Sequence, residues 1–324
     1  MKKILCLSAA FLFIIPFLAY AENTLIFGIA SGYDTNYNNE DNKRGSLFYE
    51  AKIEGSLFLN ETKNHIITSG FLFSEFTDYK NYNNKLFISP GLEFKKNFND
   101  MSSGLKLYSG FARDNNDKSN EFDSFSANLF FTKIISEQTD IGLGFLYSKY
   151  FYSQYQGTAD YNTSYGYHGG RTIAAQYHGG TQENNTDFPE IISDNGKENA
   201  DFFNIYLYSD HYINKNLTIG ENLGYFENHS NFSINSYSGF KAGFYIDLSI
   251  NNSFFITPET SFSFYDYKNS TLLEKLFSSG LKTGFFLTNN TIVYINLLYD
   301  KLKSENDYNN YESMEIKCGI SFFI

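Results

Sequence analysis

The sequence predicts an all-β fold, an antiparallel up-and-down transmembrane β-barrel of about fourteen strands, with twelve or sixteen strands as alternatives. Three observations predict this fold. Apolar and polar residues alternate along most of the chain, polar connectors separate the alternating segments, and these connectors are by turns short and long. Alternation with a period of two places an apolar row on one face of a strand and a polar row on the other.

The chain begins with a predicted signal peptide, residues 1–21. Lys2 and Lys3 supply positive charge, Ile4–Leu18 form an apolar segment, and Ala19–Ala21 match an A-x-A cleavage site. The apolar segment is short for a membrane-spanning helix. We therefore expect export followed by cleavage.

Residues 22–324 are predicted to form one barrel domain, which has to be stable without a disulfide because Cys318 is its only cysteine. No segment after the leader has eighteen or more consecutive apolar residues, which excludes a helical membrane protein. The sequence has 35 Phe, 27 Tyr and no Trp. Phe and Tyr would therefore have to form the aromatic girdles at the membrane interfaces.

The chain is acidic, with a net charge of −11 at pH 7 that becomes −13 once the two lysines of the leader are removed. This balance argues against a nucleic-acid partner. No motif calls for a cofactor, and none is predicted.

Fourteen segments show the alternation. Each is long enough to cross a bilayer, which takes about nine to eleven tilted residues. In chain order, the predicted strands are 24–33, 46–59, 65–77, 85–96, 103–113, 122–135, 140–152, 201–213, 217–228, 236–250, 253–266, 273–287, 291–301 and 311–324.

The segment Leu47–Leu59 shows the pattern most clearly, with apolar residues and glycine at odd positions and Glu50, Lys52 and Glu54 at even ones. A slip of one residue would move the polar row into lipid, so the register is strongly specified. The third, ninth, twelfth and thirteenth segments alternate less cleanly, and their facing stays open. The other clear lipid-facing rows are Leu86/Ile88/Leu92/Phe94, Phe125/Ala127/Leu129/Phe131, Ile141/Leu143/Phe145/Tyr147, Phe240/Ala242/Phe244/Ile246/Leu248/Ile250 and Met314/Ile316/Cys318/Ile320/Phe322/Ile324.

The connectors give independent support for a barrel. Short periplasmic turns and longer extracellular loops are the arrangement of outer-membrane barrels, which a soluble exported β protein, the alternative, has no reason to follow. The short connectors are Asn60–Asn64, Asn97–Met101, Ser136–Thr139, Asn214–Asn216, Asn251–Asn252 and Thr288–Asn290. The longer ones are Asp34–Gly45, Asp78–Asn84, Asp114–Glu121, Ser153–Ala200, His229–Asn235, Tyr267–Leu272 and Leu302–Asn310.

Backbone hydrogen bonding adds two expectations. A spanning sheet with free edges would leave unpaired backbone groups in hydrocarbon, so the first and last strands should pair. Pro90 and Pro258 each remove one donor from the ladder. We expect both to lie on lipid-facing rows and to be accommodated by a β-bulge.

The whole mature sequence resembles bacterial outer-membrane β-barrel proteins. The resemblance rests on the leader, the alternating connectors and the last segment, Met314–Ile324, which looks like the C-terminal signal for barrel assembly, although Ile324 is not aromatic. Gly32-Tyr33-Asp34-Thr35-Asn36 is similar to the start of several barrels, including the barrel half of surface-lipoprotein assembly modifiers. The helical-repeat domain of those modifiers is not found in the sequence, so their function is not transferred. The resemblance implies an outer-membrane location, with membrane lipids and the barrel assembly machinery as partners.

A barrel of this size is too wide for its own side chains to fill, so the inward polar rows should line a wet interior. Two interpretations remain open: the charged wall sets a solute preference, or opposite charges pair across strands and only stabilise the wall. The acidic candidates are Glu50, Glu54, Glu93, Asp210, Asp247, Glu259 and Glu315. The basic candidates are Lys52, Lys85, Lys95, Lys106, Arg113, Lys241, Lys282 and Lys317.

The connector 153–200 is unusually long, and loops above about fifteen residues are usually functional or disordered. It contains Tyr-His-Gly-Gly twice, at 167–170 and 177–180, on either side of a segment, 171–176, that is predicted to form a strand-like arm. The connector is predicted to be extracellular. It either constricts the pore mouth or remains an exposed surface loop.

Three residues of this connector are candidates for a role in the loop. Arg171 would contribute charge to a constriction, and His168 and His178 are candidates for binding a metal. Two histidines without a nearby cysteine or carboxylate pair make a poor site, so no metal is predicted.

The sequence predicts a channel for the passive diffusion of small hydrophilic solutes. The alternative is a barrel that does not conduct and serves surface export, assembly or adhesion. A lipid hydrolase is a third possibility, because Asn228-His229-Ser230-Asn231 faintly resembles the His-Ser-Asn chemistry of outer-membrane phospholipases. Adjacent side chains on a strand point to opposite faces, so His229 would not reach Ser230, and no catalytic residue is predicted.

Overall fold

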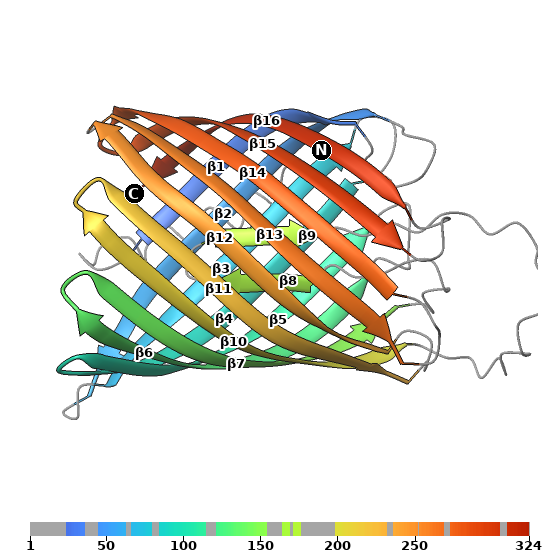
Figure 1. Ribbon diagram of the computed structural model, residues 1–324, viewed down its shortest axis with the longest axis horizontal. Helices are drawn as coiled ribbons and strands as arrows, with labels where there is room; N and C mark the ends of the chain where they lie inside the picture. The colour runs from blue at the N-terminus through green and yellow to red at the C-terminus, as the bar shows by residue number, and fades with distance from the viewer. Residues whose placement is uncertain are drawn as a thin grey trace, which may run out of the picture.

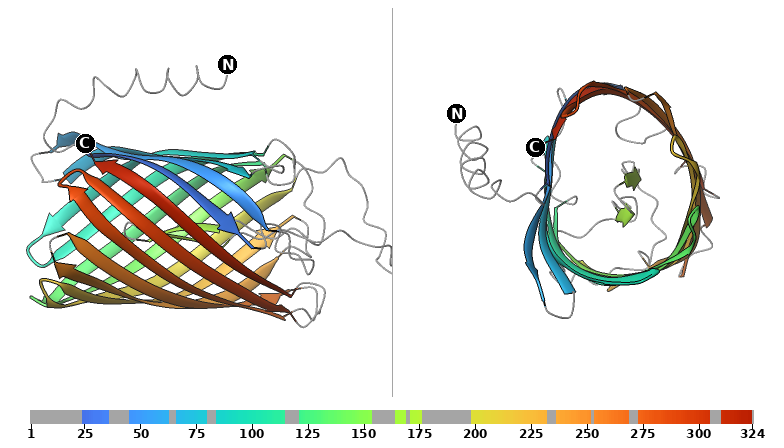
Figure 2. Two further views of the ribbon diagram at one scale, coloured as in Figure 1. Left: turned by 90° about the horizontal axis from the view of Figure 1, so that it is seen from above. Right: turned by 90° about the vertical axis from the view of Figure 1, so that its left-hand side faces the viewer.

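Fourteen antiparallel strands close into a single barrel, as a computed structural model of the chain shows (Figure 1). The view along the barrel in Figure 2 shows the strands arranged as a ring. This confirms the predicted fold class. The structure describes residues 24–35, 45–62, 66–79, 84–114, 121–153, 164–168, 171–175, 198–231, 236–251, 253–268, 273–304 and 310–323.

Each predicted segment corresponds to one strand of the barrel, with ends that differ by three residues or fewer. The predicted signal peptide lies outside the described residues. The strands are β1 (Thr24–Asp34), β2 (Ser46–Glu61), β3 (Ile66–Tyr79), β4 (Asn84–Phe98), β5 (Met101–Asp114), β6 (Phe122–Ser136), β7 (Thr139–Tyr152), β10 (Asn199–Asn214), β11 (Leu217–Ser230), β12 (Tyr237–Asn251), β13 (Phe254–Tyr267), β14 (Leu273–Thr288), β15 (Thr291–Ser304) and β16 (Tyr311–Phe323).

The barrel is closed by its first and last strands. β1 pairs with β16 from Ile26 opposite Phe323 to Asp34 opposite Glu315, and it pairs with β2 on its other side. β7 and β10 are also neighbours, so the long connector between them returns the chain to the adjacent position in the sheet. Closure leaves no strand edge unpaired within the barrel, as a lipid environment requires.

The two faces of the wall differ as the alternation predicts. On β2, Leu47 and Tyr49 are 47% and 59% exposed on the outside, whereas Phe48 between them is 2% exposed and faces inward. The strand pairings place every described member of the lipid-facing rows predicted above on this outer face. Ile324, the last member of its row, lies outside the described residues. Within the described ranges, no helix is both long and apolar enough to cross a membrane.

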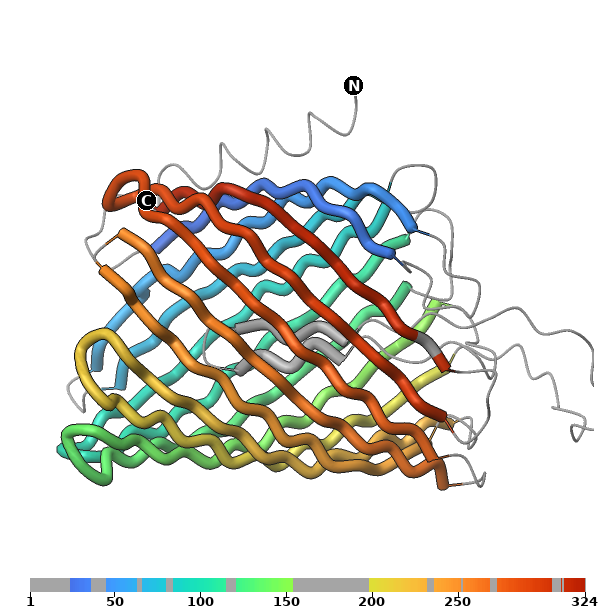
Figure 3. The backbone as a smooth tube through the Cα atoms, turned by 45° about the horizontal axis from the view of Figure 1, so that its top comes forward, coloured from blue at the N-terminus to red at the C-terminus, as the bar shows by residue number. Residues whose placement is uncertain are grey.

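Tight turns join the strands at one end of the barrel, and the long connectors leave from the other (Figure 3). Asparagine closes several turns because its side chain can bond to the backbone two residues ahead. The Oδ1 atoms of Asn214 and Asn251 accept hydrogen bonds of 2.8 Å from the N–H groups of Asn216 and Ser253. The end with the tight turns is the turn end of the barrel, and the end from which the long connectors leave is the loop end.

The predicted bulges at the two prolines are wrong. Pro90 and Pro258 do lie on the outward row, but the register is the same before and after each of them. The ladder to one neighbouring strand is interrupted there, because proline has no N–H to donate. Register shifts occur instead beside the tight turns, for example between Tyr212 and Asn214 and between Phe286 and Thr288. The barrel therefore absorbs its irregularity at the turn end.

Candidate functional site: the inner wall

The inner wall carries the predicted charged residues, with one exception. Every acidic candidate, and every lysine among the basic candidates, lies on an inward-facing row. Arg113 is the exception: it shares the outward row of β5 with Phe111, and its guanidinium bonds to Asp123 on β6 at 2.6 Å. Its charge suggested the lumen, but its position is at the loop end, where the outer face leaves the apolar belt. A pore-lining role for the inward residues stays a prediction.

The first part of this wall is charged and lies on β16, β2, β4 and β5. Lys317 Nζ lies 2.8 Å from Glu50 and 3.7 Å from Glu315. Lys52 pairs with Glu54 at 3.2 Å, and Lys106 on β5 pairs with Glu93 on β4 at 3.3 Å. Opposite charges are therefore neutralised locally.

Several of the inward lysines also lie against aromatic rings. The Nζ atoms of Lys52, Lys106 and Lys282 lie 4.8, 5.7 and 5.5 Å from the ring centroids of Phe73, Phe130 and Tyr294. A cation within about 6 Å of a ring face is attracted to it. These contacts hold the ammonium groups close to the wall, so they project less into the lumen.

Sequence reasoning missed several inward acids. Asp34 is buried and accepts a 2.7 Å hydrogen bond from Ser313, and the fully buried Glu274 accepts a 3.0 Å bond from Tyr267. Glu75 and Asp300 also face inward. Asp34 could have been found, because it continues the even-numbered row of the first strand.

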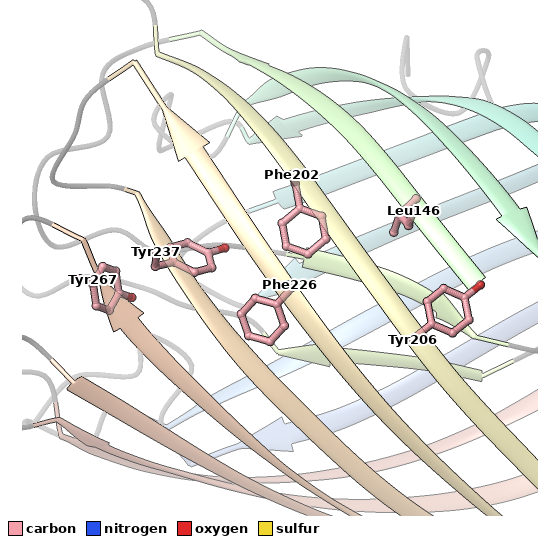
Figure 4. Packing of buried hydrophobic residues seen from close by; sticks show 6 residues of the cluster. All are labelled: Leu146, Phe202, Tyr206, Phe226, Tyr237 and Tyr267. Carbon is pink, nitrogen blue, oxygen red and sulfur yellow. The ribbon is translucent and has the colours of Figure 1, made fainter. Parts of the chain in front are cut away.

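The opposite part of the wall is aromatic. In the closed strand order β10 lies opposite β1, and the largest buried cluster lies on β10 and its neighbours (Figure 4). The ring centroid of Phe226 lies 6.2 Å from that of Phe202, 6.1 Å from that of Tyr237 and 5.2 Å from that of Tyr265. The largest aromatic cluster therefore lies across the lumen from the Lys317–Glu50 pair, and the strands that carry it also bear inward charges such as Asp210 and Lys241.

Glycines allow these rings to lie flat against the wall. On several strands an inward glycine lies directly opposite an inward aromatic residue, and a Cβ added at the glycine would overlap the ring. Covering a glycine with a cross-strand ring is a known way to stabilise a sheet position that lacks a side chain. The tyrosine examples are Gly142 with Tyr208, Gly144 with Tyr206, Gly220 with Tyr245 and Gly319 with Tyr294.

Replacing Gly144 with valine is expected to destabilise the barrel by about 1–3 kcal/mol, the usual cost of overpacking. The new side chain would displace Tyr206, whose hydroxyl bonds to Asn128 at 3.0 to 3.1 Å. The measurement is the unfolding midpoint in denaturant. Gly70→Val, on the outward row of β3, is the control for adding valine to a strand without a steric clash, because a Cβ there would be 3.8 Å from its nearest neighbour. Equal effects of the two substitutions would contradict the proposed role of the glycine.

Inward residues at the loop end are almost completely buried. Asp114 and Glu274 are 1% and 0% exposed, and Phe48 and Tyr237 are each 2% exposed. Inward residues nearer the turn end are less buried, and Lys282 is exposed. The wall is therefore more accessible from the turn end than from the loop end.

The long connector contains the predicted arm. Arg171–Ala175 forms strand β9, which pairs with β8 (Ser164–His168) so that His168 lies opposite Arg171 in the backbone register. Figures 1 and 2 draw this hairpin within the outline of the barrel. His178 lies outside the described residues. A role for Arg171 in a constriction stays a prediction, and nothing tests a role for His168 or His178 in the loop.

The residues considered for a hydrolase do not face one another. His229 is exposed on the outer face and bonds to Glu227 at 2.8 Å, whereas Ser230 donates a 2.6 Å hydrogen bond to Glu198. The adjacent side chains belong to opposite rows, as alternation requires.

No family model matches this chain, and no curated protein matches its sequence. Solved structures do resemble it. A loop-deletion mutant of OmpT, an outer membrane protein of Vibrio cholerae, superposes with a TM-score of 0.51 at 8% identity, over 93% of this chain and 99% of that one. A mutant of the TodX monoaromatic hydrocarbon channel gives 0.51 at 8% identity, over 95% and 91%. The chain therefore has the fold of a bacterial outer-membrane β-barrel.

Proposed function

We propose that the protein is a passive channel for small hydrophilic solutes in the bacterial outer membrane. The observation that carries the proposal is the inner wall, where charged and polar rows run along a closed barrel whose outer face is apolar. Such a wall suits water and polar solutes rather than lipid. The local pairing of charges, as between Lys106 and Glu93, predicts weak selectivity between anions and cations.

The membrane partners follow from the same architecture. Outer-membrane lipids would contact the apolar belt, and β16, with its outward Met314, Ile316 and Phe322, would present the C-terminal signal to the barrel assembly machinery. We propose no catalytic residue, cofactor or metal.

Planar-bilayer recording tests the channel directly. Purified protein is expected to give discrete conductance steps, and deletion of residues 160–195 is expected to enlarge them because the deleted segment includes the hairpin drawn within the barrel. An equally long Gly/Ser replacement is the control, since it keeps the length of the connector but removes its sequence. A folded barrel that stays silent both with and without the segment would overturn the channel.

Burial of the inward side chains at the loop end favours the second candidate, a non-conducting barrel for surface export, assembly or adhesion. This candidate predicts no conductance from the intact chain. It also predicts loss of surface binding or display when residues 160–195 are removed. Comparing the intact chain with the variant that lacks residues 160–195 therefore separates the two functions.

A further inference from the structure

Two lysines face each other on the outer surface at the loop end of β14 and β15. Lys275 and Lys303 are direct cross-strand partners. Both are exposed, and the neighbouring Leu276 and Leu302 are buried on the inward row, so both lysines belong to the outward face. Directly opposed residues in an antiparallel pair have Cβ atoms about 4.5–5.5 Å apart.

Two like charges in this arrangement repel each other unless an anion lies between them. In the part of the chain that the structure describes, neither Lys275 nor Lys303 forms an ion pair with a carboxylate. The outward acids on the flanking strands are Asp266 and Glu312, and Glu312 is already paired with Lys301. Within the described ranges, no carboxylate therefore compensates the positive charge of the lysine pair.

Toward the turn end, the outer surface next to the lysine pair is mostly apolar, apart from the Lys301–Glu312 ion pair and Ser279. Phe264 lies opposite Lys275 on β13, and Phe277 and Tyr299 form an edge-to-face pair with ring centroids 6.4 Å apart. Further toward the turn end, Leu281 and Leu297 are direct cross-strand partners on the same outward rows. Positive charge at the loop end thus leads directly into a surface suited to acyl chains.

We propose that Lys275 and Lys303 bind the phosphorylated headgroup of a lipid in the outer leaflet, with its acyl chains on the rings and leucines below. The charge selects an anion, and two ammonium groups side by side fit the oxygens of one phosphate. The adjacent aromatic rings and leucines select a lipid over a free anion. The loop end is the end that faces the outer leaflet. This proposal is independent of whether the barrel conducts.

Native mass spectrometry of the detergent-solubilised full barrel tests the site, with lipid A carrying both phosphates as the probe. A lysine near a charged membrane surface contributes a factor of about five in binding. Lys275→Gln with Lys303→Gln is therefore expected to weaken binding about 25-fold. Lys133→Gln, an exposed outward lysine near the turn end of β6, is the control and should leave binding unchanged. Unchanged binding by the double variant, or an equal loss in the control, would overturn the proposal.

Two further measurements separate the site from general effects. Lys275→Glu removes the like-charge pair, so it should raise the unfolding midpoint while it abolishes lipid binding. A loss of binding accompanied by a lower midpoint would mean that the lysines act only through the fold. Dephosphorylated lipid A should bind the unchanged protein and the double glutamine variant equally weakly. Excess inorganic phosphate should not displace intact lipid A from the unchanged protein. Displacement by inorganic phosphate would show a free-anion site and overturn the lipid assignment.

Discussion

Arginine in place of Leu223 is expected to destabilise the barrel by about 2–4 kcal/mol, the cost of a cation on the lipid face at the bilayer midplane. Leu223 lies near the middle of β11, is 55% exposed on the outer row, and has Leu207 and Ala242 as its direct cross-strand neighbours. None of these side chains offers the guanidinium a hydrogen-bond acceptor. The loss of unfolding free energy is measured by denaturant titration in lipid vesicles. The folded fraction at each denaturant concentration is read from the mobility of unboiled samples on a gel.

Asn222→Arg is the matched control for this substitution. Asn222 is the preceding residue on the same strand, and its side chain lies on the inward row. Arginine there would face the lumen, where water and carboxylates are available, so a change within about 0.5 kcal/mol is expected. A similar loss at both positions would show that the effect is not caused by lipid. It would contradict the assignment of the two faces.

The face assignment is also the part of the structure that the sequence predicts best. On β12 the row from Phe240 to Ile250 is apolar at every second position, and each of its members lies on the outer face. Burial of one row against lipid makes any other register costly, so the pattern alone decides it. Strand ends are predicted to within three residues because the polar turns interrupt the alternation.

The sequence predicts less where both rows are mixed. β3 has Phe71 and Phe73 on its inward row and Phe76 on its outward row, so hydropathy does not assign a face to Glu75. Arg113 shows the opposite error, in which a charge suggested the lumen although the row of β5 assigned the residue to the outside. The face of Glu75 follows only from how β3 pairs with its neighbours, whereas the alternation along β5 is enough to place Arg113 on the outside.

Contacts across the closure of the barrel are beyond sequence analysis altogether. Lys317 on β16 lies opposite Gly32 of β1, and Glu50 on β2 lies opposite Ala30. The two residues are far apart in sequence, and nothing local links them. The small inward residues of β1 leave space above the strand, and the ammonium and carboxylate meet there at 2.8 Å. The pair therefore connects the last strand to the second across the first.

Lys317→Met is expected to lower the stability of the barrel by about 3 kcal/mol, near the lower end of the cost of removing one partner from a buried ion pair. The side chains of Lys317 and Glu50 are only 18% and 10% exposed, and Glu315 lies 3.7 Å from the same ammonium. Without the lysine, these carboxylates would face each other with no cation between them. The free energy of unfolding in denaturant, followed by tyrosine fluorescence because the chain has no Trp, measures the effect.

A double-mutant cycle distinguishes this electrostatic cause from a loss of packing. Adding Glu50→Gln to Lys317→Met removes the carboxylate that lost its partner, so the double variant should recover most of the stability. Residues that share an ion pair show interaction energies of about 0.5–3 kcal/mol in such cycles. If the two substitutions were instead simply additive, the pair would contribute nothing to closure. The pairing of β1 with β16 would then rest on the backbone ladder from Ile26 to Asp34 alone.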